Sequence, residues 1–145
     1  MNKTKIIVDA RVYIPEAHMK GRLTKGKSSC GILVINERGE EFEFKKYLGE
    51  MTVPEAEFRG LIFALDQAVS VSRYDVEVRM DSELVIKWMK GEYRMRKEHI
   101  RPLFDEAKKY EQRFKSVEYI HHPNTSYLAK KAHKLAEEAY KESQL

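Results

Sequence analysis

The order of the periodic segments is the feature that most constrains how this chain folds. Residues 5–14 alternate between an apolar face and a mixed face, and this period of two predicts a strand. Segments 30–36 and 41–48 have the same character and are separated by a short turn, so we expect the three to form an antiparallel meander. Helical and strand-like segments then alternate, which predicts strands that return to one mixed sheet through helical crossovers.

The later segments complete the order β-β-β-α-β-α-α-β-α. Strands are predicted at 74–80 and 116–122, and helices at about 53–71, 82–90, 99–114 and 126–142. Thr52 and Glu55 fit a capping box at the start of the first helix, and Gly91 is expected to end the second. We therefore predict an α/β fold with a five-stranded mixed sheet and helices on both faces.

Length and composition narrow the class of protein. A chain of 145 residues fits one domain, residues 1–145. No apolar run approaches the roughly 18 residues of a membrane helix, the first residues lack a signal-peptide pattern, and the single cysteine, Cys30, excludes an intrachain disulfide. We expect a cytoplasmic monomer that binds no membrane. The net charge of +4 favours polyanionic partners without identifying them.

Three acidic residues occupy positions where a carboxylate is awkward. Asp9 lies inside the first strand, where aspartate is unfavourable. Glu57 is in line with the core-facing stripe of its helix, and Asp81 closes a strand. Burying an unpaired charge is costly, and one bound divalent cation would stabilise all three carboxylates at once.

Each acid also has an ordinary explanation when it is taken alone. Asp81 could cap the helix that follows it, and Glu57 could be a first-turn carboxylate favoured by the helix dipole. Asp9 could pair with Arg11 or another base. Taken together with the order of the elements, the three positions favour a shared metal site.

Four segments carry a resemblance to type 1 ribonucleases H. Residues 56–65 (AEFRGLIFAL) resemble the family segment A-E-[YF]-x-A-L-x-x-A-L, and residues 81–93 (DSELVIKWMKGEY) resemble D-S-x-x-V-x-x-x-x-x-G-x-[YW]. Residues 6–10 (IIVDA) match the opening strand, and residues 132–139 (AHKLAEEA) resemble the final-helix segment A-D-x-L-A-x-x-A. The resemblance covers nearly the whole chain and implies the ribonuclease H fold and metal-dependent hydrolysis of the RNA strand of RNA–DNA hybrids.

The resemblance also implies the site residues. Asp9, Glu57 and Asp81 match three metal-binding carboxylates of the family, and His133 stands where a fourth is usual. We expect His133 to be a ligand, with a packed structural histidine as the alternative. The first aspartate is followed by Ala10 and a long basic loop instead of a glycine-rich turn, so the usual RNA contacts of that turn are not assigned.

The implied mechanism uses two divalent ions, Mg2+ or Mn2+. Asp9 bridges both ions, Glu57 and Asp81 hold one, and His133 completes the other. Because imidazole suits Mn2+ better than Mg2+, we expect Mn2+ to support activity better. The family commonly has a mobile histidine near 121–124, and His122 or His121 is expected to fill that role, with a loop histidine of no function as the alternative.

A basic stretch follows Asp81 and suggests the path of a nucleic acid. Such charges typically contact phosphates, although a solvated surface is the ordinary explanation of a charge run. Trp88 is a candidate to stack on a sugar or base, with packing as its alternative, and Ser82 and Asn124 are candidates to read the 2′-hydroxyl. The basic candidates are Lys87, Lys90, Arg94, Arg96 and Lys97.

Two other functions compete with an RNA–DNA hybrid nuclease. The histidine at 133 and the altered first loop are compatible with a catalytically silent module that still binds nucleic acid. A scaffold domain that has kept only the fold is the third reading. Hybrid-cleavage and gel-retardation assays distinguish the three.

Overall fold

The computed structural model describes residues 3–14, 24–123 and 125–145. Within these ranges the chain forms five strands and four helices. The strands are β1 (Thr4–Tyr13), β2 (Gly26–Ile35), β3 (Glu41–Met51), β4 (Asp75–Met80) and β5 (Ser116–His121). The helices are α1 (Val53–Ala68), α2 (Glu83–Met89), α3 (Arg101–Glu111) and α4 (Tyr127–Ser143).

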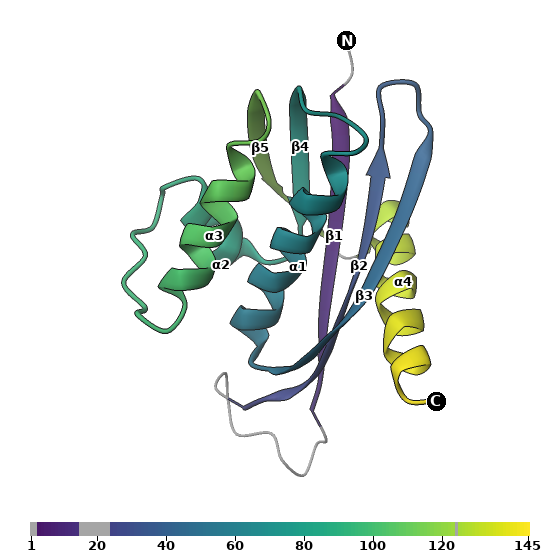
Figure 1. Cartoon of the computed structure of the whole chain (residues 1–145), viewed down its shortest axis with the longest axis vertical. Coiled ribbons are helices and arrows are strands. Elements are labelled where there is room, and N and C mark those ends of the chain that lie inside the picture. The colour runs from purple at the N-terminus through teal and green to yellow at the C-terminus, as the bar shows by residue number, and fades with distance from the viewer. Residues whose placement is uncertain (1–2, 15–23, 124) are drawn as a thin grey trace.

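The strands form one mixed sheet in the order β3-β2-β1-β4-β5, as Figure 1 shows. β1 pairs antiparallel with β2, and β2 with β3, so the predicted meander is confirmed. β4 runs parallel to β1, and β5 runs parallel to β4. The two parallel pairings place the carboxyl ends of β1, β4 and β5 at the same edge of the sheet.

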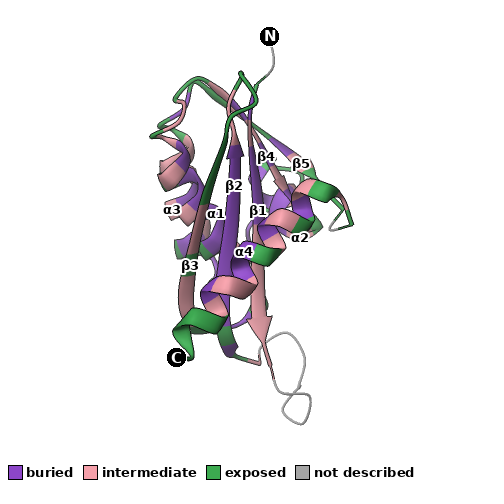
Figure 2. Ribbon diagram, turned by 90° about the vertical axis from the view of Figure 1, so that its right-hand side faces the viewer, coloured by how far each residue is buried: buried purple, intermediate pink, exposed green. Residues whose placement is uncertain are grey.

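Alternation along β1 divides the core between the two faces of the sheet. Ile6 and Val8 join the larger core cluster, which α1, α2 and α3 cover. Ile7 packs on the other face with Leu33 and Ala132, under α4. Figure 2 shows α4 against this second face, with the buried strands behind it. The prediction of helices on both faces is confirmed, and Asp9 shares the α4 face because it lies two residues after Ile7.

Local signals in the sequence set the ends of two helices. The side chain of Thr52 accepts the backbone N–H of Glu55, and the Glu55 carboxylate accepts the Thr52 N–H at 2.9 Å, which is the predicted capping box. Gly91 follows α2 with a φ of +79°, a conformation that glycine adopts without a steric cost. The capping box therefore sets where α1 begins, and Gly91 sets where α2 ends.

The largest boundary difference concerns β2, which begins at Gly26 and not at residue 30. Ser28 and Ser29 have low strand propensity, but their hydroxyls donate to Gly26 O at 3.0 Å and Ala136 O at 2.6 Å, so they are buried with partners. β3 is also longer than predicted, and α1 and α3 are shorter. Residues 15–23 of the predicted basic loop lie outside the described residues.

Among the helices of the described ranges, none combines the length and the apolar character that a membrane crossing requires.

Candidate active site

Two of the predicted acids lie where the parallel ladder between β1 and β4 ends. The last residue pair of that ladder is Val8 and Met80, so Asp9 and Asp81 are the next residues on adjacent strands. Met80 also pairs with His121 at the end of β5. The carboxyl edge of a sheet is where α/β folds commonly place their ligands, and three chemically active side chains gather there.

Glu57 reaches the same place from α1. It lies one turn after the capping box and in line with Leu61, Ala64 and Ala68, all of which are fully buried. A cavity of about 90 Å³ is lined by Asp9, Glu57 and Asp81, together with Val8, Ala10, Arg11, Met80 and Ser82. The three carboxylates that the sequence singled out therefore share one cavity.

Asp9 is largely buried, with 12% of its side chain accessible, whereas 51% of the Asp81 side chain is accessible. Burial raises its pKa above the usual value for aspartate, and Arg11 and His133 oppose that rise. Arg11 Nε lies 3.4 Å from Asp9 Oδ2, and His133 Nδ1 lies 3.3 Å from the same oxygen. The Asp9 carboxylate is thus contacted by both residues: Arg11, which was considered as its ion-pair partner, and His133, which was expected to share a metal ion with it.

His133 is held from both sides of its ring. Arg11 Nε–H donates to His133 Nδ1 at 2.7 Å, and His133 Nε2 lies 2.7 Å from Glu137 Oε1. Because Arg11 can only donate, Nδ1 accepts, and the proton of the ring is on Nε2 facing Glu137. In this tautomer the approach of Nδ1 to Asp9 is a contact between two acceptors, with Arg11 beside them.

The carboxylates of the cavity and the nearby imidazole of His133 are suitable ligands for a hard divalent cation. Carboxylate oxygens are the ligands that Mg2+ and Mn2+ prefer, and imidazole suits Mn2+. Across the described part of the chain, however, no three His, Cys, Asp or Glu side chains are gathered closely enough to form a ready-made centre. The carboxylates line a common cavity, and binding an ion there requires their side chains to turn toward one another.

The two neighbouring histidines differ in their surroundings. His121 is 45% exposed, and its Nε2 lies 2.9 Å from Asp81 O and 3.7 Å from Asp81 Oδ1. His122 is only 8% exposed and is hydrogen-bonded to Ser126, and burial lowers its pKa. Of the two predicted candidates for the mobile histidine, His122 has a packed ring and His121 lies beside the acids; the role itself stays a prediction.

Ser82, and not Asp81, caps α2. The Ser82 hydroxyl accepts the backbone N–H of Val85 at 3.3 Å. The Asp81 side chain is 51% exposed and lies beside His121. The cap explanation therefore does not account for Asp81, and its carboxylate is available to the cavity.

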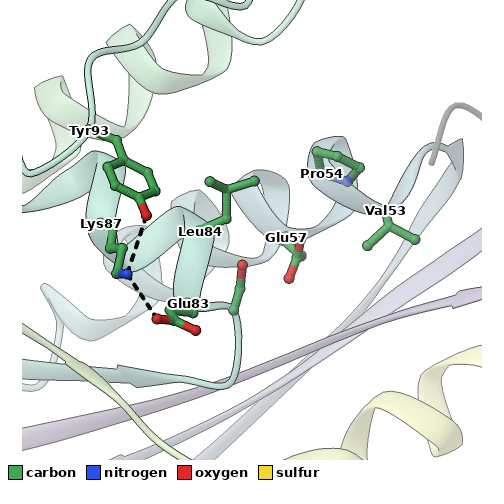
Figure 3. A pocket seen from close by; sticks show the side chains of 8 residues that line it. Val53, Pro54, Glu57, Glu83, Leu84, Lys87 and Tyr93 are labelled. Carbon is green, nitrogen blue, oxygen red and sulfur yellow. Dashed lines mark hydrogen bonds and ion pairs between the residues drawn. The ribbon is translucent and has the colours of Figure 1, made fainter.

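A larger pocket of about 460 Å³ adjoins the acidic cavity and shares Glu57 and Ser82 with it. Figure 3 shows its walls, the start of α1 on one side and α2 on the other. Lys87 lies at one end, 2.9 Å from Glu83 Oε1 and 3.3 Å from the hydroxyl of Tyr93. The remaining wall residues are Val53, Pro54 and Leu84, which give the pocket an apolar floor with a cation and a phenol at its rim.

The predicted basic stretch is exposed, but its tryptophan is not. Lys90, Arg94, Arg96 and Lys97 are all exposed in and after the end of α2. Trp88 is 4% exposed and stacks on Phe58, with ring centroids 6.0 Å apart. The prediction that Trp88 stacks on a sugar or base is wrong because its ring is part of the core. Asn124 lies outside the described residues.

Sequence reasoning missed two parts of this site. It named Arg11 only as a partner of Asp9, and it did not name Glu137. The helical spacing of four between His133 and Glu137 was a usable signal, because residues so spaced are neighbours on a helix. The contact of Arg11 with His133 spans 122 positions of the chain, and nothing in the local sequence indicates it.

The amino-acid sequence matches a family model described as "Reverse transcriptase-like" over residues 18–139. The bifunctional protein Rv2228c of Mycobacterium tuberculosis is 34% identical over 77 residues, which are 53% of this chain and 21% of that protein. The chain thus spans about a fifth of the length of the curated relatives it matches.

Solved ribonuclease H structures resemble this fold over nearly the whole length of the chain. The N-terminal RNase H domain of Rv2228c from Mycobacterium tuberculosis is 26% identical, with a TM-score of 0.77 over 98% of this chain and 97% of that one. LC11-RNase H1, isolated from compost by a metagenomic approach, is 25% identical in its complex with an RNA/DNA hybrid, with a TM-score of 0.81 over 99% and 100% of the two chains. The predicted fold class is confirmed.

Proposed function

The chain belongs to the reverse transcriptase-like family and has the ribonuclease H fold, and on that premise we propose that it is an endonuclease that hydrolyses the RNA strand of RNA–DNA hybrids. The observation that carries the proposal is the cavity that Asp9, Glu57 and Asp81 line together. The structure of LC11-RNase H1 with an RNA/DNA hybrid supports the choice of substrate.

We propose that the cavity holds two divalent ions, Mg2+ or Mn2+. Such ions activate a water molecule and neutralise charge at the leaving oxygen. Asp9, Glu57 and Asp81 would hold one ion, and Asp9 and His133 would hold the other. Because His133 offers a nitrogen where a carboxylate is usual in the resembled family, Mn2+ supports activity better than Mg2+ in this proposal.

The protein residues have separate roles in the reaction. Burial raises the pKa of Asp9, so a cation beside it would stabilise the charged form that burial disfavours. His121 is exposed and lies beside Asp81, where it can exchange protons between the reacting phosphate and solvent.

The pocket next to the cavity gives a path for the substrate. It shares Glu57 and Ser82 with the cavity and carries Lys87 and Tyr93 at its rim. We place the hybrid across this pocket, with phosphates toward the exposed basic residues that follow α2. The Ser82 hydroxyl accepts the N–H of Val85 and can still donate to a 2′-hydroxyl. The role of Asn124 stays a prediction.

A cleavage assay on a labelled RNA–DNA hybrid tests the proposal, with Mg2+ and Mn2+ in separate reactions. Asp9→Asn should abolish cleavage and leave the fold intact. The matched control is Asp66→Asn, because Asp66 is an exposed aspartate paired with Arg113 at 3.1 Å near the far end of α1. Full activity of Asp9→Asn would remove Asp9 from the mechanism, and no cleavage by the wild type in either ion would remove the nuclease itself.

One observation favours a second function, a nucleic-acid-binding module without catalysis. Arg11 already contacts Asp9 at 3.4 Å, so the acid can be neutralised without a metal. Gel retardation with the same hybrid at a stated salt concentration distinguishes this module from a scaffold that binds no nucleic acid. Replacing one phosphate-contacting base such as Arg96 with alanine should reduce the slope of log affinity against log salt by about 1. A monomeric, cytoplasmic protein stays part of the proposal.

A further inference from the structure

We propose that Arg11 is an internal cation that competes with a metal ion for the position between Asp9 and His133. The inference rests on the proposed function, because it concerns the second of the two ion positions. It goes beyond that function because it assigns to a residue of the chain itself the ability to inhibit metal binding. Arg11 holds the second position when metal is scarce and leaves it when metal is abundant.

The distances place the guanidinium where the second ion would be bound. Arg11 Nε lies 3.4 Å from Asp9 Oδ2 and 2.7 Å from His133 Nδ1. These two atoms are themselves 3.3 Å apart. Two adjacent ligands of an octahedral Mg2+-like ion, each at about 2.1 Å, are separated by about 3 Å. Oδ2 and Nδ1 are therefore spaced as a ligand pair, and one N–H group of Arg11 faces both.

The histidine is prepared to bind an ion once Arg11 leaves. Glu137 fixes the proton on Nε2, so the Nδ1 lone pair points toward Asp9 and Arg11. A carboxylate on the far nitrogen is the usual support of a metal-bound histidine. The same ring in the opposite tautomer would present an N–H to the ion. Glu137 thus sets His133 as an acceptor for any cation at this position, guanidinium or metal.

Arg11 has room to move away. Its side chain is 39% exposed, whereas the Asp9 side chain is 12% exposed. The guanidinium can turn into solvent without unpacking the core, because its partners among the described residues, Asp9 and His133, are both in the site. Displacement by metal therefore needs only a side-chain rotation.

Calorimetric titration with Mn2+ alone, without substrate, tests this competition. Arg11→Ala should raise the affinity of the weaker Mn2+ position at least about tenfold, because the ion no longer has to displace the guanidinium, and Arg11→Gln should do the same. The matched control is Arg113→Ala, because Arg113 is 46% exposed and also paired with an aspartate, Asp66. It should leave both affinities within twofold of the wild type. Urea unfolding of each variant without metal establishes that it is folded.

The outcomes separate this inference from the proposed function. Unchanged or weaker Mn2+ binding in both Arg11 variants would overturn the competition, whatever the cleavage assay shows. Tighter binding in both variants would support it even if the wild type cleaves no hybrid. No Mn2+ binding by any variant would overturn the competition and the metal-dependent nuclease together.

Discussion

The contact between α4 and the sheet gives a prediction about Gly31, the residue that pairs with Asp9 across β1 and β2. A methyl group added at Gly31 would lie 2.0 Å from Ala132 O and 2.6 Å from Ala136 N. Both are backbone atoms of α4, so no rotation of a side chain can relieve the overlap. Restoring ordinary contact requires the helix to move by roughly 1.4 Å.

The expected cost of Gly31→Ala follows from this displacement. Overpacking a core typically costs about 1–3 kcal/mol and occasionally more, and an obstacle made of backbone is at the severe end of that range. We expect a loss of about 3 kcal/mol in the free energy of unfolding. For a domain of this size that lowers Tm by roughly 6–12 °C. The helix also carries His133, so Mn2+ binding should weaken in the same variant.

Urea unfolding, followed by far-UV circular dichroism and by the fluorescence of Trp88, measures the effect. The control is Gly60→Ala, where the added methyl group meets Ala10 Cβ at 3.2 Å. There the gain of about 1 kcal/mol in helix propensity offsets the tight contact. The free energy of unfolding should therefore change by no more than about 1 kcal/mol. If Gly31→Ala is as stable as the Gly60→Ala control, the close approach of α4 to β2 is not required, and the argument about His133 loses its basis.

Three further predictions concern single side chains. His133→Asp should shift the preferred ion from Mn2+ to Mg2+ in the cleavage assay; an unchanged preference would make His133 a packing residue. Burial, with Arg79 as a lesser cause, lowers the pKa of His122 in the folded protein. Unfolding therefore takes up a proton, and the urea midpoint should fall as the pH drops below about 6.5. His122→Gln should make the midpoint depend less on pH, and an equally steep dependence in this variant would contradict the prediction. Burial raises the pKa of Cys30 to about 12, so a disulfide reagent should label it only after unfolding, and rapid labelling of the native protein would refute this.

Local chemistry made much of the fold predictable. The capping box of Thr52 and Glu55 and the turn at Gly91 depend on residues within one helical turn of each other. The alternation in β1 likewise assigned Ile7 and Asp9 to one face before any helix was placed on it. These features are encoded by neighbours in the chain, and the structure confirms them.

The features that the sequence did not reveal depend on distant partners. Ser29 looks like a loop residue until α4 provides Ala136 O as its acceptor. Trp88 lies in the predicted basic stretch, but it is buried and stacks on Phe58 of α1. His121 and His122 are adjacent, and only the end of β5 determines which one faces Asp81 and which one packs on Ser126. No local pattern carries this information.

Arg11 and His133 have to be considered as one unit. A carboxylate at position 133, as in the family segment that the final helix resembles, would give Arg11 a second anionic partner beside Asp9. Hydrogen bonds between two charged groups are stronger than those to a neutral acceptor, so Arg11 would then be harder to displace. The neutral His133 still accepts from Arg11 at 2.7 Å, but it holds the guanidinium less firmly and leaves a nitrogen ligand when Arg11 departs. A histidine at 133 therefore suits a site that contains Arg11, because a metal ion can displace the guanidinium only if neither ligand binds it too tightly.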